Sequence, residues 1–356
     1  MAREGTFGAS SARDGVRHVQ ATFFAVTNAG YFPAATAMLN SLRVTGHEHE
    51  VVFGDCGLSP DQQARLEPHS RIFEIPAAEA RDPTLLKSFP HAMNVDGVLV
   101  FIDSDMIVTD DLGPVLALAA EGKICAFADP ELDRRFPEWE ELFGLKGPLR
   151  EERFISAGFL AWSHSHWPGL LGRWREVCER IPAGATLAHG ATNVNPFAQG
   201  DQDALNAVLM SEVPTGAVEI LPDDERPVWR TTQVRVVDER TLQCRLNGNV
   251  PKLVHADGSR KPWQNRMWWR VRKDAYVRLF RRLLFADDVP VTIAPSEVPI
   301  WLRPTTLGRS CLQLLNAINA ATSFVFRRRV TKFIAKHVKA ARRGLRARRD
   351  LQASHA

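Results

Sequence analysis

Cysteine is scarce in this chain of 356 residues and shows no pairing pattern. Five cysteines, an odd number, lie far apart, which excludes a disulfide framework and the usual spacings of zinc ligands. We therefore expect buried thiols in a reducing cytoplasm. The five are Cys56, Cys125, Cys178, Cys244 and Cys311.

Long hydrophobic runs are missing as well. The candidate run, residues 311–326, covers about 16 positions and is interrupted by polar side chains, whereas a membrane-spanning helix needs ~20 apolar residues. Residues 1–17 contain glycine, serine and mixed charges, without the apolar stretch of a secretory signal. We expect a flexible lead over residues 1–17, and a linker with a docked helix over residues 289–326.

Acidic residues are absent from residues 327–349, which hold 11 of the 45 lysines and arginines. The chain before this stretch has a net charge of −6. Apolar residues such as Val330, Phe333 and Val338 recur there at helical spacing. Each basic residue near an anionic leaflet contributes about 1 kcal/mol, so residues 327–356 are predicted to form a helical tail on an anionic membrane surface. A solvated run of charges and a nucleic-acid patch are the alternatives, and the stretch lacks the interleaved stacking aromatics of a single-strand binder.

Strands and helices alternate along the chain. This alternation predicts an α/β fold with a mostly parallel sheet, whose ligands bind at the carboxyl ends of the strands. The expected strands are residues 19–26, 51–53, 71–75, 98–102, 124–128, 159–162, 218–221 and 252–254. The expected helices are residues 33–43, 60–67, a stretch through 85–87, 167–180, 202–210 and 268–285, with a loop at 182–199 and a proline-rich linker at 289–304.

Two carboxylates follow the fourth expected strand, in the triplet Asp103-Ser104-Asp105. Hard cations such as Mn²⁺ and Mg²⁺ prefer oxygen ligands and keep open positions for a diphosphate, so the triplet suggests chemistry on a phosphorylated donor. A solvated turn is the alternative, because Asp-x-Asp is common in acidic loops.

Two further motifs lie downstream. Asp201-Gln202-Asp203 stands where a loop enters a helix, and a His-x-x-Gly-x-x-Lys-Pro-Trp segment begins at His255. With the loop that ends at Tyr31 and the Asp-x-Asp triplet, these motifs occur in the order found in glycosyltransferase family 8. The chain resembles that family over residues 19–265.

The resemblance implies a retaining enzyme with the GT-A nucleotide-diphospho-sugar transferase fold, a mixed and mostly parallel sheet flanked by helices, over residues 18–288. Such an enzyme transfers a hexose from a UDP-sugar to a hydroxyl of a glycan or glycolipid. With its helical basic extension, it would work in the cytoplasm at the inner face of the membrane. Mn²⁺ (or Mg²⁺) would be bound by Asp103, Asp105 and His255.

The same resemblance implies the donor-binding residues. Thr27 replaces an acidic residue of some relatives, and Ser156 replaces an asparagine, so the base and sugar preferences stay open. Tyr31 as simple helix-start packing, and Lys261 as a solvated lysine, are the structural alternatives. The nucleoside would contact Ala25, Thr27, Tyr31 and Ser104, the diphosphate Gly258 and Lys261, and the sugar Asp129 and Ser156.

Four residues are implied to act in catalysis. Gln202 would lie beneath the sugar and stabilise an oxocarbenium-like transition state, and Lys87 would lie beside the donor diphosphate. Asp201 and Asp203 would orient sugar hydroxyls, or supply a nucleophile if a covalent intermediate forms. The structural alternatives are a helix N-cap for Asp201, a first-turn carboxylate for Asp203, a solvated Lys87 and an ordinary hydrogen-bonded His255.

Two other functions fit parts of the sequence. A haloacid-dehalogenase-like phosphohydrolase would use Asp103 as nucleophile and Asp105 as general acid. That class expects its Asp-x-Asp on the first strand, whereas three expected strands precede the strand that carries the triplet here. A protein that binds sugar nucleotides, or docks on a membrane, without catalysis is the non-enzymatic alternative.

Overall fold

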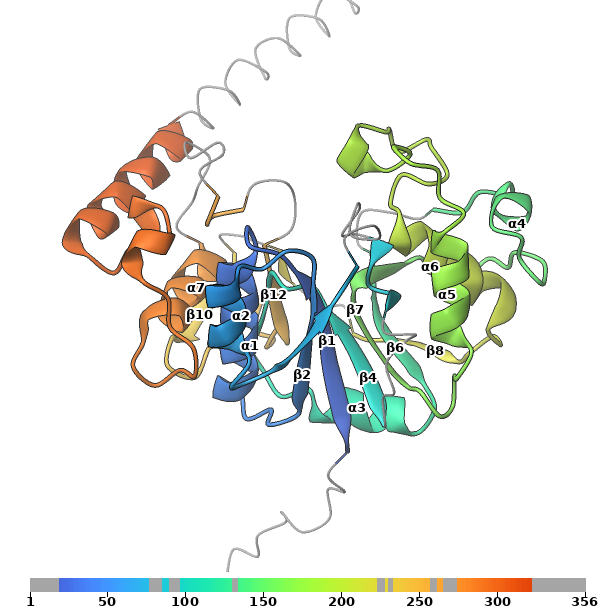
Figure 1. Cartoon of the computed structure of the whole chain (residues 1–356), viewed down its shortest axis with the longest axis horizontal. Coiled ribbons are helices and arrows are strands. Elements are labelled where there is room, and N and C mark those ends of the chain that lie inside the picture. Colours follow the sequence, from blue (N-terminus) through green and yellow to red (C-terminus); the bar gives the residue numbers. More distant parts are fainter. Residues whose placement is uncertain are drawn as a thin grey trace, which may run out of the picture. The chain divides into compact units, whose positions relative to one another are not determined.

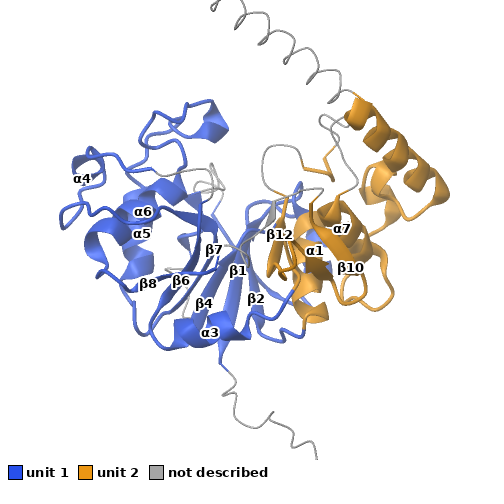
Figure 2. Ribbon diagram, turned by 180° about the vertical axis from the view of Figure 1, so that it is seen from behind, with its two compact units in different colours: residues 1–32, 46–104, 110–226 blue, residues 33–45, 105–109, 227–356 orange. Residues whose placement is uncertain are grey.

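The computed structural model describes residues 19–76, 85–89, 97–129, 134–222, 228–229, 233–256, 261–264 and 274–321 (Figure 1). The chain divides into two compact units whose segments interleave in the sequence (Figure 2). The first unit comprises Met1–Phe32, Gly46–Ser104 and Asp110–Arg226. The second unit comprises Pro33–Thr45, Asp105–Thr109 and Pro227–Ala356.

A seven-stranded mixed sheet forms the centre of the first unit, with the strand order β3-β2-β1-β4-β7-β6-β8. The pairs from β3 to β4 are parallel, β7 runs antiparallel to both its neighbours, and β8 is parallel to β6. This confirms the predicted mixed, mostly parallel sheet. Its strands are β1 (Ala21–Thr27), β2 (Glu50–Asp55), β3 (Arg71–Glu74), β4 (Val98–Ile102), β6 (Ile124–Ala128), β7 (Ile155–Ser163) and β8 (Val218–Ile220).

Helices flank this sheet, and apolar burial explains their positions. Ten of the residues of α6 are buried, and α6 packs against α5. Beneath them, the Phe101 ring stacks on Trp162 at 4.9 Å and meets the edge of Trp174 at 5.5 Å. Aromatic pairs of this kind add to the burial of apolar area. The helices are α2 (Pro60–Leu66), α3 (Gly113–Ala120), α4 (Trp139–Leu142), α5 (Leu170–Cys178), the 3₁₀ helix η3 (Leu187–His189) and α6 (Asp201–Glu212).

The second unit contains a small three-stranded sheet and a hairpin. In the sheet, β12 (Leu253–His255) lies between β5 (Met106–Val108) and β9 (Val228–Trp229). The hairpin pairs β10 (Arg235–Asp238) with β11 (Gln243–Arg245). The helical elements are α1 (Phe32–Val44), α7 (Ala275–Phe285), η5 (Pro295–Glu297), η6 (Ile300–Leu302) and a helix over residues 306–321.

Asn40 shows how α1 is fixed within the second unit. Its side-chain amide donates to the carbonyl oxygens of Leu283 (2.7 Å) and Val291 (2.6 Å), and its Oδ1 accepts from the Val291 amide. A buried asparagine with three such bonds leaves few polar atoms unsatisfied. It therefore ties α1 to α7 and to the segment that follows α7.

Three expectations about elements need correction. The described residues 85–89 form turns and 3₁₀ bends instead of a continuous helix. The segment 289–304 is well packed, because Val291, Val298 and Trp301 are buried between its prolines. The Trp301 indole also donates to the Pro262 carbonyl at 3.0 Å. Strand β7 starts four residues earlier than expected, at Ile155.

Candidate functional site

The predicted residues of the first unit gather where its strands end. Strand β4 ends at Ile102, and the Asp103 amide then donates to the Gly158 carbonyl at 2.9 Å. Strand β1 ends at Thr27, and Asp129 directly follows β6. Strand ends of an open α/β sheet are the usual place for ligand-binding residues, because side chains there are not used by the sheet itself.

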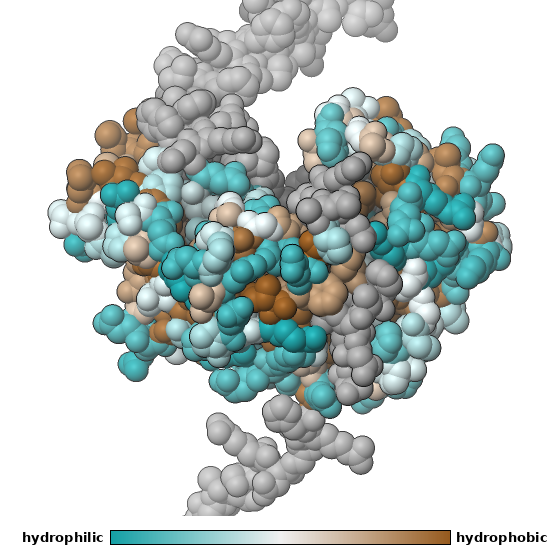
Figure 3. Space-filling view, viewed as in Figure 1, coloured by the Kyte–Doolittle hydropathy of each residue, from teal (hydrophilic) through white to brown (hydrophobic). Residues whose placement is uncertain are grey.

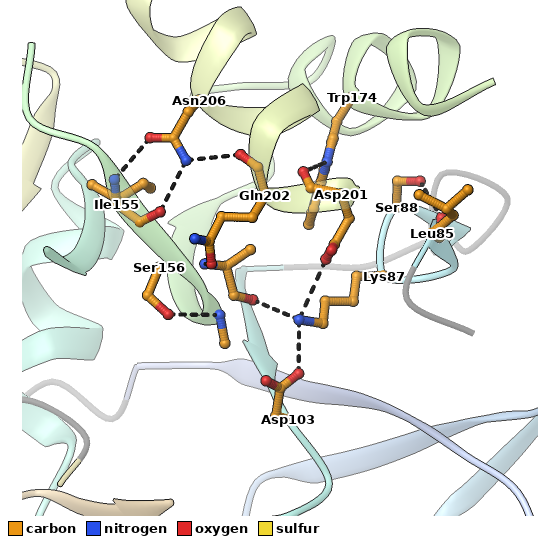
Figure 4. Close-up of polar contacts among 12 residues, drawn as sticks. Leu85, Lys87, Ser88, Asp103, Ile155, Ser156, Trp174, Asp201, Gln202 and Asn206 are labelled. Carbon is orange, nitrogen blue, oxygen red and sulfur yellow. Dashed lines mark hydrogen bonds and ion pairs between the residues drawn. The ribbon is translucent and has the colours of Figure 1, made fainter. Parts of the chain in front are cut away.

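Lys87 joins three parts of the first unit, namely the end of β4, helix α6 and strand β7 (Figure 4). Its ammonium lies 2.7 Å from an oxygen of Asp103, 3.3 Å from an oxygen of Asp201, and 3.1 Å from the Ala157 carbonyl oxygen. Burial by itself would lower the pKa of Lys87, but the two carboxylates outweigh it and raise that pKa above its ordinary value. Lys87 is therefore a charged residue inside the site, and the alternative of a solvated helix lysine is wrong.

Gln202 and Asn206, one turn apart on α6, hold the start of strand β7 (Figure 4). The Gln202 side chain accepts from the Ala157 amide at 3.0 Å and donates to Asp129 at 3.1 Å. Asn206 bonds both the amide and the carbonyl of Ile155, at 2.8 and 2.9 Å. The predicted site glutamine is thus held by β7 and by the acid that follows β6.

The two aspartates of the Asp-Gln-Asp motif have different surroundings. Asp201 is buried beside Lys87, and its carbonyl accepts from the Trp174 indole at 2.9 Å. Asp203 is fully buried and paired with Arg134. Burial raises the pKa of Asp203, against the opposing effect of Arg134. The N-cap alternative for Asp201 is wrong, because Gly200 is the N-cap and Asp201 is the first helical residue.

Two residues of the second unit contact the Asp105 carboxylate. The Asp105 Oδ1 lies 3.1 Å from His255 Nε2 and accepts a hydrogen bond when that nitrogen carries a proton, and its other oxygen contacts the Lys261 ammonium. Lys261 also donates to the Ala256 carbonyl at 2.8 Å. Burial alone would raise the pKa of Asp105, but Lys261 and then His255 outweigh it and hold that pKa well below its usual range.

The described residues also contain a set of side chains that suits a divalent cation. One ligand atom from each of Asp103, Asp105 and His255 lies within 4.8 Å of the others. Two carboxylate oxygens and one imidazole nitrogen form a donor set that Mn²⁺ accepts readily. The predicted ligands therefore fit the ion chemically, and both aspartates are also paired with lysines.

The remaining predicted residues lie in strands or next to them, with Ala25 and Thr27 in β1 and Ser156 in β7. Ala25, Thr27 and Ser104 are buried, and the Thr27 hydroxyl has no hydrogen-bond partner among the described residues. Tyr31 is partly buried at the start of α1, and its amide donates to Asn28. The Ser156 hydroxyl accepts from the Gly158 amide at 3.3 Å. Gly258 lies outside the described residues.

Sequence reasoning missed two residues that shape this region. Asp55, at the end of β2, accepts from the amides of Gly57 and Leu58 at 2.7 and 2.6 Å. It thus organises the loop that runs beside the end of β1, where the Cys56 amide donates to the Thr27 carbonyl. Arg134 is the second missed residue. An aspartate or arginine that belongs to no motif cannot be recognised as a site residue from a single sequence.

Comparisons with known proteins place the fold. No protein-family model matches the sequence, and no curated protein matches it. Among solved structures, an active-site mutant of LgtC is similar with 18% identity and a TM-score of 0.50, over 78% of this chain and 98% of that one. The galactosyltransferase LgtC, in complex with donor and acceptor sugar analogues, gives 16% identity and a TM-score of 0.48.

The bifunctional glycosyltransferase WbbM gives 15% identity and a TM-score of 0.49. The similarity covers 76% of this chain and 50% of the WbbM chain, so this chain matches only half the length of WbbM. Similarity at such low identity is informative about the fold and not about the reaction. The mixed seven-stranded sheet with flanking helices agrees with it. The chain has the GT-A fold, as the LgtC mutant structure does.

Proposed function

We propose that this protein is a retaining glycosyltransferase that moves a hexose from a UDP-sugar to a hydroxyl of a glycan or glycolipid. The observation that carries the proposal is the cluster of Asp103, Asp105 and His255 on a GT-A fold. A fold alone hosts many functions, whereas a donor set of this chemistry at strand ends is a property of the site.

The predicted cation, Mn²⁺ or Mg²⁺, would be held by this cluster, where it would neutralise charge that develops on the departing nucleoside diphosphate. Lys261 supplies a second, fixed positive charge close to Asp105. The nucleoside would contact Ala25, Thr27 and Tyr31. The buried Thr27 hydroxyl supports this assignment, because a buried polar atom without a partner in the described residues is costly unless a ligand satisfies it.

The donor sugar would lie over Gln202 and Asp129. Their mutual hydrogen bond fixes both side chains, so that they can hold sugar hydroxyls without first reorganising. Gln202 is a poor nucleophile, and its carbonyl oxygen is already bonded to the Ala157 amide. We therefore favour entry of the acceptor hydroxyl on the face from which the diphosphate leaves, with the leaving phosphate accepting the hydroxyl proton.

Calorimetry with a panel of nucleoside diphosphates, with and without Mn²⁺, tests this proposal. UDP should bind with metal dependence in the wild type and lose that dependence in Asp105→Ala. Asp61→Ala, which removes a highly exposed acid on α2, is the matched control and should bind as the wild type does. The proposal would be overturned if UDP bound with the same affinity with and without metal, and in the wild type and Asp105→Ala alike. Tight UDP binding without hydrolysis or transfer of a donor sugar would favour a non-catalytic protein.

We further propose that the protein works in the cytoplasm, held at an anionic membrane surface. In the described part of the chain, no helix is long and apolar enough to span a bilayer. The helix of residues 306–321 has an exposed apolar stripe of Leu307, Leu314 and Ile318. Figure 3 shows how hydrophobic side chains are distributed over one face of the molecule. The stripe lies directly before the basic residues 327–349, which lie outside the described residues.

Deletion of residues 327–356 tests the membrane proposal. The deletion should release the protein from vesicles that contain anionic lipid, and it should leave metal-dependent UDP binding unchanged. Binding to neutral vesicles is the control, and it should be weak for both proteins because a charged tail gains little there. Vesicle binding that survives the deletion would remove the tail as the anchor.

A further inference from the structure

The guanidinium of Arg134 connects two elements at the N-terminus of α6. Its Nε and Nη2 donate to the two oxygens of Asp203, each at 2.9 Å. Nη1 and Nη2 also donate to the carbonyl oxygens of Asn193 (2.5 Å) and Asn195 (2.9 Å). A planar guanidinium suits this fork geometry, because its donors have fixed directions. Arg134 thus binds the first turn of α6 and the loop before it at once.

Asp203 completes the connection from the helix side. Besides Arg134, it accepts from the Gln199 amide at 2.8 Å, so both of its oxygens have hydrogen-bond donors. Its side chain has no exposed surface, and that of Arg134 is 6% exposed. Nearby, the Trp139 indole donates to the Pro196 carbonyl at 2.7 Å, which fixes the same loop a second time.

The helix geometry separates Asp203 from its neighbour Asp201. Two residues along an α-helix are rotated by about 200° around the axis, so the two aspartates face opposite sides. Asp201 faces Lys87 and the end of β4, whereas Asp203 faces Arg134 and the loop. Gln202 lies between them and is bonded to Asp129.

The segment after strand β6 is therefore attached to α6 at two points. Asp129 bonds Gln202, and Arg134, five residues later, bonds Asp203. The two contacts are made by adjacent residues of the first turn of α6. Any displacement of Asp203 would move Gln202 with it, because the two share one peptide bond in a helix that is packed in the core.

We propose that Arg134 and Asp203 form a clasp, defined by these two residues, that holds the 193–199 loop on the first turn of α6 and sets the position of Gln202. Asp203 is then a positioning residue, and neither a sugar ligand nor a nucleophile. The catalytic part of this inference rests on the proposed function. The structural part, attachment of the loop, does not.

Hydrogen exchange measured by mass spectrometry, together with donor turnover, tests the clasp in Arg134→Met, Asp203→Asn and the double variant. Amides of residues 193–199 should exchange at least tenfold faster in each variant, because their anchor is lost. Turnover should fall about 10–100-fold while remaining measurable, since a misplaced catalytic group has an effect of this order. Turnover of the double variant should be no slower than that of either single variant, because each single substitution already removes the contact between Arg134 and Asp203.

Glu212→Gln is the matched control, since it removes the carboxylate that Arg173 binds at the C-terminal end of the same helix. That pair is also largely buried, with a 2.7 Å contact. The control should lower the melting temperature without changing exchange of residues 193–199 or turnover. Arg134→Lys keeps the charge with fewer donors, and it replaces Arg134→Met if that variant does not fold.

The clasp is overturned if residues 193–199 keep their protection in the Arg134 variant. The assignment of Asp203 is overturned if Asp203→Asn abolishes turnover, by more than about 10³-fold, while loop exchange stays unchanged, because that pattern belongs to a group that touches the reacting atoms. If the wild type transfers and hydrolyses no sugar nucleotide, the proposed function fails, and the exchange measurements still decide whether the clasp exists.

Discussion

At the residue scale, lysines pair with both acids of the Asp-Ser-Asp triplet. Asp103 is paired with Lys87, and Asp105 with Lys261 and His255. A buried carboxylate without such a partner would be strongly destabilising, whereas a paired and hydrogen-bonded one is tolerated. These pairs orient both carboxylates of the Asp-Ser-Asp triplet through groups of the chain itself.

The depressed pKa of Asp105 predicts a specific pH dependence of stability. The folded-state pKa of Asp105 lies below its unfolded value of about 4. Its contribution to the free energy of unfolding is therefore complete above that value and is lost as pH falls towards the folded-state pKa. The difference in unfolding free energy between the wild type and Asp105→Asn should be constant above about pH 5 and shrink below about pH 4. Urea unfolding from pH 3 to 7, with a chelator present, measures it. A difference that does not change with pH would contradict the depressed pKa.

The thiols allow a second prediction at this scale. Burial, and next to it the Asp55 charge, raises the pKa of Cys56 to about 12, and burial raises that of Cys125 and Cys244 to about 12. At pH 8 such thiols carry little thiolate, the reactive form. The partly exposed Cys311 should therefore be labelled first by iodoacetamide, and all five should react in urea. Native Cys56 that reacts as fast as Cys311 would contradict this order.

At the element scale, α6 holds the site by binding backbone atoms of β7. Asn206→Leu keeps the side-chain volume but leaves the Ile155 amide and carbonyl without these partners, which should cost about 2–4 kcal/mol of unfolding free energy. Chemical denaturation measures the loss. Asn193→Leu, at an exposed position, is the control and should change stability by less than about 0.5 kcal/mol. Equal effects of the two substitutions would show that the backbone contacts of Asn206 are unimportant.

The sequence predicted the elements that have strong local signals. The continuous apolar run of β4 is the signature of a strand buried on both faces, and it correctly located the Asp-Ser-Asp triplet at a strand end. Strand β5, only three residues long, was missed because it forms through pairing with β12, about 145 residues later. Local patterns carry no information about such a distant partner.

Prediction of the site residues was also limited to what local sequence patterns can indicate. The resemblance to a known family implied roles for Lys87 and Gln202, and the structure places Lys87 beside Asp103 and Gln202 beside Asp129. Arg134 was missed, because its role depends on four contacts with residues at least 59 positions away. Tertiary contacts of this kind decide whether a motif aspartate such as Asp203 faces a ligand or an arginine.

At the scale of the whole molecule, charge and apolar surface are distributed unevenly. The residues before 327 are net acidic, and the basic residues are concentrated in 327–349. On the helix of residues 306–321, Leu312 and Leu315 are buried, whereas Leu307 and Leu314 are 60% and 62% exposed. Electrostatic attraction and apolar insertion are independent contributions to binding at a membrane surface, and they respond differently to salt.

The exposed stripe therefore leads to a prediction that separates the two contributions. Leu307→Gln with Leu314→Gln should weaken binding to anionic vesicles by about 30-fold, since partial burial of each leucine is worth about 1 kcal/mol. This loss should persist at high salt, because apolar burial is not screened, whereas the loss caused by deleting residues 327–356 should diminish. Val237→Gln, which removes another exposed apolar side chain, is the control and should bind as the wild type does. Vesicle sedimentation at low and high salt measures all four proteins. If the double variant binds normally, the stripe does not touch lipid, and the basic tail alone would have to account for any association.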